Sequence, residues 1–205
     1  CAARAWRESA TTLVVFRVAP YHRRSNNKDA AMRERTIASH FVRAALRGAT
    51  RQGLDGPALL RRAGIQPALL DEPRARIAPE QFTRLMQLLW EVLDDEYMGF
   101  GEVRSKRGTF AMMCHTLIHC RTLEKALQRG ELFYGLFPQA PLIHLRREGD
   151  LVRLSLEERH LSDPDHFLAE SLLVIWHRLA SWLIGQRIRL EEATFSYPAP
   201  DHQAE

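Results

Sequence analysis

Two histidines with cysteines beside them form the arrangement in this sequence that is most similar to a metal site. His115 and His119 lie four residues apart in a segment of helical periodicity, and Cys114 and Cys120 are their neighbours. This spacing puts both imidazoles on one face of a helix, as a metal site requires. The metalloprotease pattern has a glutamate directly after the first histidine, where this chain has Thr116, and no third ligand is evident. We therefore expect no bound metal and interpret the segment as a packing surface.

The other patterns that would indicate an enzyme are incomplete. Residues 99–101 (GFG), followed by Arg104, are similar to a dinucleotide-binding loop, but the third glycine is missing and a helical segment precedes them. The sequence contains neither a G-x-S-x-G nucleophile elbow nor a Walker loop. The acidic run at 94–96 fits the end of a helix, whereas acid–base catalysis needs two groups that converge on one pocket. We predict neither a cofactor nor an enzymatic activity.

Polar side chains among the aromatic residues of the C-terminal half are the candidates for a ligand pocket. Such pockets are mostly apolar and contain a few well-placed polar groups. The residues that we expect to face a pocket are His115, His119, Tyr134, Trp176, His177 and Arg178. An arginine or histidine beside an apolar cavity suits a ligand that carries a carboxylate. Each of these side chains also fits a purely structural role in the core.

The composition is that of a globular protein. The chain has 205 residues, of which 45% are hydrophobic and 26% are charged. A chain of this length buries enough apolar surface to fold without disulfides or a structural metal. The net charge of +4 is spread along the chain, so it supports only a weak attraction to nucleic acid.

Cysteine usage and hydropathy indicate a cytoplasmic protein. The three cysteines are odd in number and irregularly spaced, unlike those of a secreted disulfide framework. We find no secretory signal, because Arg17 interrupts the short apolar stretch at 11–19. No apolar run reaches the ~18–20 residues of a membrane span, so we expect no membrane partner.

Residues 1–35 differ in character from the rest of the chain. The stretch 21–35 is polar and basic, and such a stretch buries too little surface to offset its ordering entropy. We interpret 1–35 as a mobile extension with one short ordered piece near Leu13–Val18, and 36–205 as the folded domain.

Apolar residues at helical spacing predict five helices in the first two thirds of the chain. They cover residues 36–48, 56–64, 79–95, 109–119 and 123–137. Gly48 is the expected end of the first helix, and Thr109 and Thr122 are the expected caps of the last two.

The period changes after residue 141. Leu142–Arg147 and Leu151–Glu157 alternate apolar and polar residues around a Gly-containing turn, which predicts a β-hairpin. Asp163 is the expected cap of a long, largely buried helix over 164–184, and 190–197 is a further strand. The fold class is therefore α+β: a helical N-terminal half, then a small, mainly antiparallel sheet of about three strands packed on the long C-terminal helix.

The order of these elements resembles the arabinose-binding-like N-terminal sensor domain of AraC-family transcription regulators. The stretch ARIAPEQFTRLMQLLWEVLDDEYMGFG (75–101) is similar to the opening of that domain, and 107–137 is similar to its middle. The hairpin, the helix within 163–188 and the stretch LEEATFSYPAPDH (190–202) continue the resemblance, which covers 36–205.

The resemblance implies a domain that senses a small-molecule effector and forms a homodimer. In this family the sensor is followed by a region with two helix-turn-helix units, which contacts DNA. This sequence ends where that region would begin, so we expect DNA binding only through the absent part.

Two other classes stay open. One is a stand-alone, truncated interaction module that forms heterodimers with full-length regulators. The other is a small enzyme, which would need a pocket with strongly perturbed titrating groups.

Overall fold

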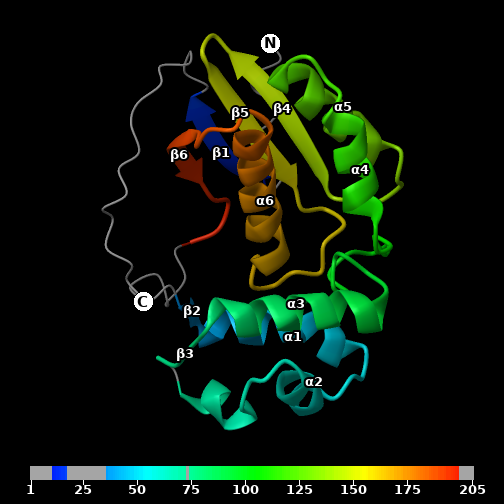
Figure 1. Cartoon of the computed structure of the whole chain (residues 1–205), viewed down its shortest axis with the longest axis vertical. Helices are drawn as coiled ribbons and strands as arrows, with labels where there is room; N and C mark the ends of the chain where they lie inside the picture. The colour runs from blue at the N-terminus through cyan, green and yellow to red at the C-terminus, as the bar shows by residue number, and fades with distance from the viewer. Residues whose placement is uncertain (1–10, 18–35, 73, 199–205) are drawn as a thin grey trace.

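The computed structural model describes residues 11–17, 36–72 and 74–198, which form an α+β structure with two layers (Figure 1). The lower layer in Figure 1 is helical, and the upper layer is a β-sheet with the later helices of the chain beside it. We call these layers the helical lobe and the sheet lobe. Residues 1–10 and 18–35, which belong to the predicted mobile extension, lie outside the described residues.

The helical lobe contains the first three helices and a short two-stranded sheet. Its elements are β2 (Ile37–Ala38), α1 (Ser39–Arg51), α2 (Gly56–Arg62), a 3₁₀ helix (Pro67–Asp71), β3 (Arg76–Ile77) and α3 (Pro79–Leu93). α1, α2 and α3 pack around fully or nearly fully buried aliphatic side chains such as Val42, Leu60 and Leu89. The apolar periodicity therefore predicted the three helices, but it did not predict β2 and β3, and the first helix begins at Ser39 instead of residue 36.

The end predicted for the first helix at Gly48 is wrong, because α1 continues to Arg51. A Cβ atom at position 48 would lie 1.9 Å from the Met98 carbonyl oxygen. Glycine is therefore required here by the close approach of the turn at 97–100, and it does not end the helix.

The sheet lobe contains a four-stranded antiparallel sheet in the order β4-β5-β1-β6. Its strands are β1 (Thr11–Arg17), β4 (Leu142–Glu148), β5 (Leu151–Glu157) and β6 (Arg189–Thr194). The predicted hairpin is confirmed, with Glu148 opposite Leu151 across the turn. The ordered piece expected near Leu13–Val18 corresponds to β1, which pairs with β5 at seven positions and with β6 on its other side. About three strands were predicted, and β1 is the fourth.

Helix α6 (Phe167–Leu183) lies against the sheet and also contacts α1, so it joins the two lobes. It begins three residues later than predicted, after His166 in a left-handed conformation (φ 53°). Asp163 still serves its N-terminus, since the carboxylate accepts hydrogen bonds from the N–H groups of Phe167 (3.0 Å) and Ala169 (2.9 Å). The helix was expected to be largely buried, and its burial was overestimated, because Trp182 is 67% exposed and Val174 is 57% exposed.

Helices α4 (Thr109–Leu117) and α5 (Leu123–Gly135) complete the sheet lobe. The predicted cap at Thr122 is confirmed, because its side chain accepts a hydrogen bond from the Lys125 N–H. The cap predicted at Thr109 is wrong: this residue is the first of α4, and the Glu96 carboxylate accepts from the N–H groups before and after it. In the part of the chain that the structure describes, no helix is both long and apolar enough to cross a membrane.

Candidate ligand-binding site

A cavity of about 200 Å³ lies where the connector after α3 meets α4 and the end of α5. We call it the tyrosine pocket. Four hydroxyl-bearing residues, two cationic residues and four apolar residues line it: Tyr97, Ser105, Thr109, Tyr134, Arg104, Lys106, Val103, Phe137, Pro138 and Ala140. The pocket therefore combines an apolar wall with several hydrogen-bonding groups, as small-molecule sites do.

The hydroxyl-bearing side of the tyrosine pocket is buried. Tyr97, Ser105 and Tyr134 are only 5%, 6% and 8% exposed. Burial raises the pKa of Tyr97 well above its usual range, and the nearby carboxylates of Asp95 and Glu96 add to this effect, whereas the Ser105 side chain acts in the opposite direction. Burial also raises the pKa of Tyr134, and the nearby Tyr97 and Glu96 add to this effect. Both phenols therefore keep their protons at neutral pH and can donate hydrogen bonds.

Asp95 fixes the backbone around Tyr97 and Ser105. Its fully buried carboxylate accepts hydrogen bonds from the N–H groups of Tyr97 (2.9 Å), Gly99 (2.8 Å) and Ser105 (2.8 Å). The Glu96 N–H also donates to the Ser105 carbonyl oxygen at 2.6 Å. One side chain thus holds together the two ends of the connector that carries half of the pocket.

Tyr134 is held from behind by helix α6. The rings of Tyr134 and Trp176 meet edge-on with their centroids 6.1 Å apart. Trp176 itself fits closely against Gly130, where a Cβ atom would lie 2.4 Å from the indole ring. The position of the Tyr134 hydroxyl therefore depends on the packing between α5 and α6.

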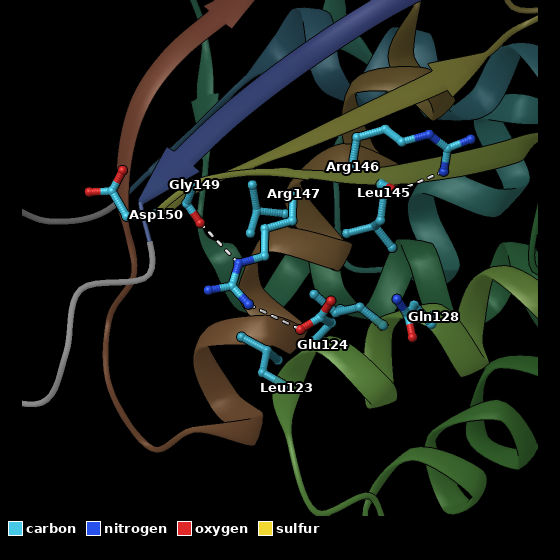
Figure 2. A pocket seen from close by; sticks show the side chains of 10 residues that line it. Leu123, Glu124, Gln128, Leu145, Arg146, Arg147, Gly149 and Asp150 are labelled. Atoms are coloured by element: carbon cyan, nitrogen blue, oxygen red, sulfur yellow. Dashed lines mark hydrogen bonds and ion pairs between the residues drawn. The ribbon is translucent and has the colours of Figure 1, made fainter.

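A second and larger cavity, of about 730 Å³, lies between α5 and the β4–β5 hairpin; we call it the hairpin groove (Figure 2). Aliphatic side chains including Leu127, Leu145 and Val152 line it. Figure 2 shows Arg147 reaching from β4 to Glu124 on α5, a contact of 3.3 Å. Both charged side chains are more than half exposed, so this ion pair contributes little stability. The groove is thus an open surface feature whose charged groups neutralise each other.

Comparison with known proteins identifies the family. Residues 53–205 match the family model described as the arabinose-binding domain of AraC transcription regulators, N-terminal. The chain belongs to this family. It is also 24% identical over 153 residues to the ornithine utilization regulator of Pseudomonas aeruginosa PAO1. That match covers 73% of this chain and 45% of the regulator, so the chain spans less than half the length of this curated relative. No solved structure was found to match.

Of the six residues that the sequence suggested for an AraC-type ligand pocket, only Tyr134 lines one of the two cavities described above. Trp176 is buried behind it. The remaining four line neither cavity: His115, His119 and Arg178 are exposed, and His177 is partly buried. Burial lowers the pKa of His177, although the Ile188 backbone acts in the opposite direction. Among the described residues, no group of three or more His, Cys, Asp or Glu is placed to hold a metal ion.

The pocket residues that sequence reasoning missed come from a segment that looked like a plain connector. Tyr97, Arg104, Ser105 and Lys106 are brought beside Tyr134 by a turn that has no sequence motif. One available signal was the pair of cations on either side of a serine in this connector. The acidic run at 94–96 was a second signal, since Asp95 and Glu96 bond backbone groups of the connector and of α4.

Proposed function

We propose that this chain is the ligand-sensing part of an AraC-type regulator that controls transcription in response to a small molecule. The family match over residues 53–205 supports a regulatory sensing role. The observation that carries the proposal is the tyrosine pocket, whose buried, hydroxyl-bearing side is formed by the connector that joins the two lobes and by the end of α5. A ligand at a junction can favour one arrangement of the lobes over another, which is the physical basis of regulation by an effector.

The connector after α3 contacts the segment that leads into α6, so a ligand in the pocket can influence the position of that helix. Between the pocket residues Tyr97 and Val103, the Phe100 carbonyl accepts a hydrogen bond from the Ser162 N–H (2.7 Å), and the Glu102 N–H donates to the His160 carbonyl (3.0 Å). These two hydrogen bonds join the segment at 158–166 to the connector. We expect a conformational change at the pocket to alter the contacts at the start of α6.

The same segment reaches the chain beyond β6. The His166 ring stacks on the Tyr197 ring with centroids 3.6 Å apart and an interplanar angle of 7°. The Tyr197 hydroxyl donates a hydrogen bond to the Glu170 carboxylate. In the proposed regulator, these contacts couple the sensor to the region that follows it.

Further parts of the proposal rest on the family. The length of the curated regulator beyond the match leaves room for a DNA-binding region. We propose that DNA is contacted through helix-turn-helix units of such a region, that the regulator is a homodimer and that it acts in the cytoplasm.

The proposal is tested with the regulator that carries this domain and its DNA-binding region. A thermal-shift screen of fatty acids, amino acids and aromatic acids selects compounds that raise the melting temperature in a concentration-dependent way. We expect each selected compound to change the affinity for promoter DNA by about fivefold or more at constant salt. Compounds that do not stabilise the protein serve as controls and should leave this affinity unchanged. Stabilising compounds without any effect on DNA affinity would contradict the sensing function.

A further inference from the structure

We infer that the tyrosine pocket binds a small monocarboxylate with a compact apolar body, held by the cations Arg104 and Lys106 and by the Tyr134 hydroxyl. This inference rests on the proposed sensing function, for which it names the site and the chemical class of the effector. The size of the pocket, its charges and its apolar surface each favour such a ligand.

The size of the tyrosine pocket favours a small ligand. Its volume of about 200 Å³ equals roughly seven water molecules at ~30 Å³ each. Sites for drug-sized molecules occupy about 300–1,000 Å³. A short or singly ringed acid therefore fits, whereas a long-chain acid or a peptide does not.

The charges around the pocket favour an anion. The charged residues that line it, Arg104 and Lys106, are both cationic. Two carboxylates lie nearby, but Asp95 accepts three backbone N–H groups and Glu96 accepts two, from Gly108 (2.8 Å) and Phe110 (2.9 Å). Both carboxylates are held on backbone N–H groups, and among the described residues neither forms an ion pair with Arg104 or Lys106, so these cations are available to a ligand.

The uncharged hydroxyl groups of the two tyrosines also favour an anionic ligand. Tyr97 and Tyr134 line the pocket and, like any tyrosine, are protonated at neutral pH, so each presents an O–H group; burial raises the pKa of both still further. Hydrogen bonds from such groups to a charged acceptor are about twice as strong as those between neutral groups. A carboxylate exploits this difference, and a neutral amide of the same shape does not.

Exposed apolar side chains at the pocket indicate that the ligand has an apolar part. Val103 is 42% exposed and Phe137 is 41% exposed, although both line the cavity. Covering them with hydrocarbon removes apolar surface from water, which stabilises the complex. The ligand is therefore amphiphilic, with its carboxylate near Arg104 and Lys106 and its hydrocarbon against Val103 and Phe137.

The test uses hexanoate, cyclohexanecarboxylate and phenylacetate, with the corresponding amides as controls. We expect at least one acid to raise the melting temperature of the chain in a concentration-dependent way, and its amide not to. Tyr134→Phe should weaken the affinity for that acid about tenfold, because a hydrogen bond to a charged group is lost. The double variant Arg104→Ala, Lys106→Ala alters exposed residues only. It therefore tests whether the two cations hold the acid, even if Tyr134→Phe impairs folding.

The hairpin groove provides the matched control. Arg147→Ala removes the cation that spans this groove, and we expect it to leave the affinity unchanged. If no acid binds, or if Arg147→Ala abolishes binding while the Arg104 and Lys106 substitutions do not, the inference is overturned. It is also overturned if an effector of another chemical class controls DNA affinity, a result that leaves the sensing function intact. An acid that binds in the tyrosine pocket without changing DNA affinity would instead contradict the sensing function alone.

Discussion

Replacing Asp95 with alanine is expected to lower the free energy of unfolding by about 3 kcal/mol or more, since each buried group left unsatisfied costs ~1–3 kcal/mol. The carboxylate is fully buried and accepts hydrogen bonds from three backbone N–H groups, those of Tyr97, Gly99 and Ser105. Alanine would leave all three donors without this acceptor. Two of these residues line the tyrosine pocket, so ligand affinity should fall together with stability.

Urea denaturation of the two proteins at neutral pH measures this difference. Asp94→Asn is the matched control, because the neighbouring carboxyl group is exposed and its residue has a left-handed conformation (φ 47°) that asparagine tolerates. We expect this control to change the stability by less than about 0.5 kcal/mol, as surface substitutions usually do. An Asp95→Ala protein as stable as the control would refute the role given to the buried carboxylate.

Gly48→Ala is expected to destabilise the protein by about 3 kcal/mol, at the upper end of overpacking effects. A Cβ atom here would lie 1.9 Å from the Met98 carbonyl oxygen and 3.0 Å from its carbon. These are backbone atoms of the turn at 97–100, so a rotamer change cannot relieve the contact. Either α1 or the connector must move, and the packing between the helical lobe and the turn is lost.

A second glycine separates this effect from the general cost of changing a helical glycine. Gly135 lies at the end of α5, and a Cβ atom there would meet no atom within 4 Å. Gly135→Ala should therefore be neutral or stabilising by up to ~1 kcal/mol, because alanine favours the helix. Equal unfolding free energies for the two alanine variants would show that position 48 tolerates a side chain.

The elements predicted correctly are those whose signals are local. The hairpin has its alternating strands and its turn within one stretch, at 142–157, and α3 has its apolar face and Pro79 within another. β1 pairs instead with strands more than 130 residues away in sequence, and its surroundings at 1–35 are polar. No local pattern indicates which distant strands would accept it, so the sheet was predicted with too few strands.

The first and last residues of the helices were predicted less well, because contacts with residues far away in the sequence determine how the helix ends are satisfied. Gly48 is a common helix-ending residue, yet its role is decided by Met98, fifty residues later. The N-terminus of α4 is satisfied by Glu96 instead of by Thr109. In both cases the deciding contact is formed only when the connector after α3 folds against other elements.

The candidate site was predicted only in part, for the same reason. Tyr134 was selected because it is a polar aromatic residue in an apolar helix, and it lines the tyrosine pocket. Arg178 was selected as the cation of the site, but it lies exposed on α6, and Arg104 and Lys106 line the pocket instead. The hydrogen bond between Asp95 and Ser105 folds the connector back on itself and so places the two cations at the pocket, and no local pattern in the sequence indicates this contact.

Amide hydrogen exchange on the chain, with and without a stabilising ligand, tests most directly the claim that the effector acts at the junction of the lobes. The expected result is slower exchange at residues 97–106 and 134–140, the two segments that form the tyrosine pocket. Slower exchange confined to 123–128 and 145–152, around the hairpin groove, would contradict this account and place the effector there.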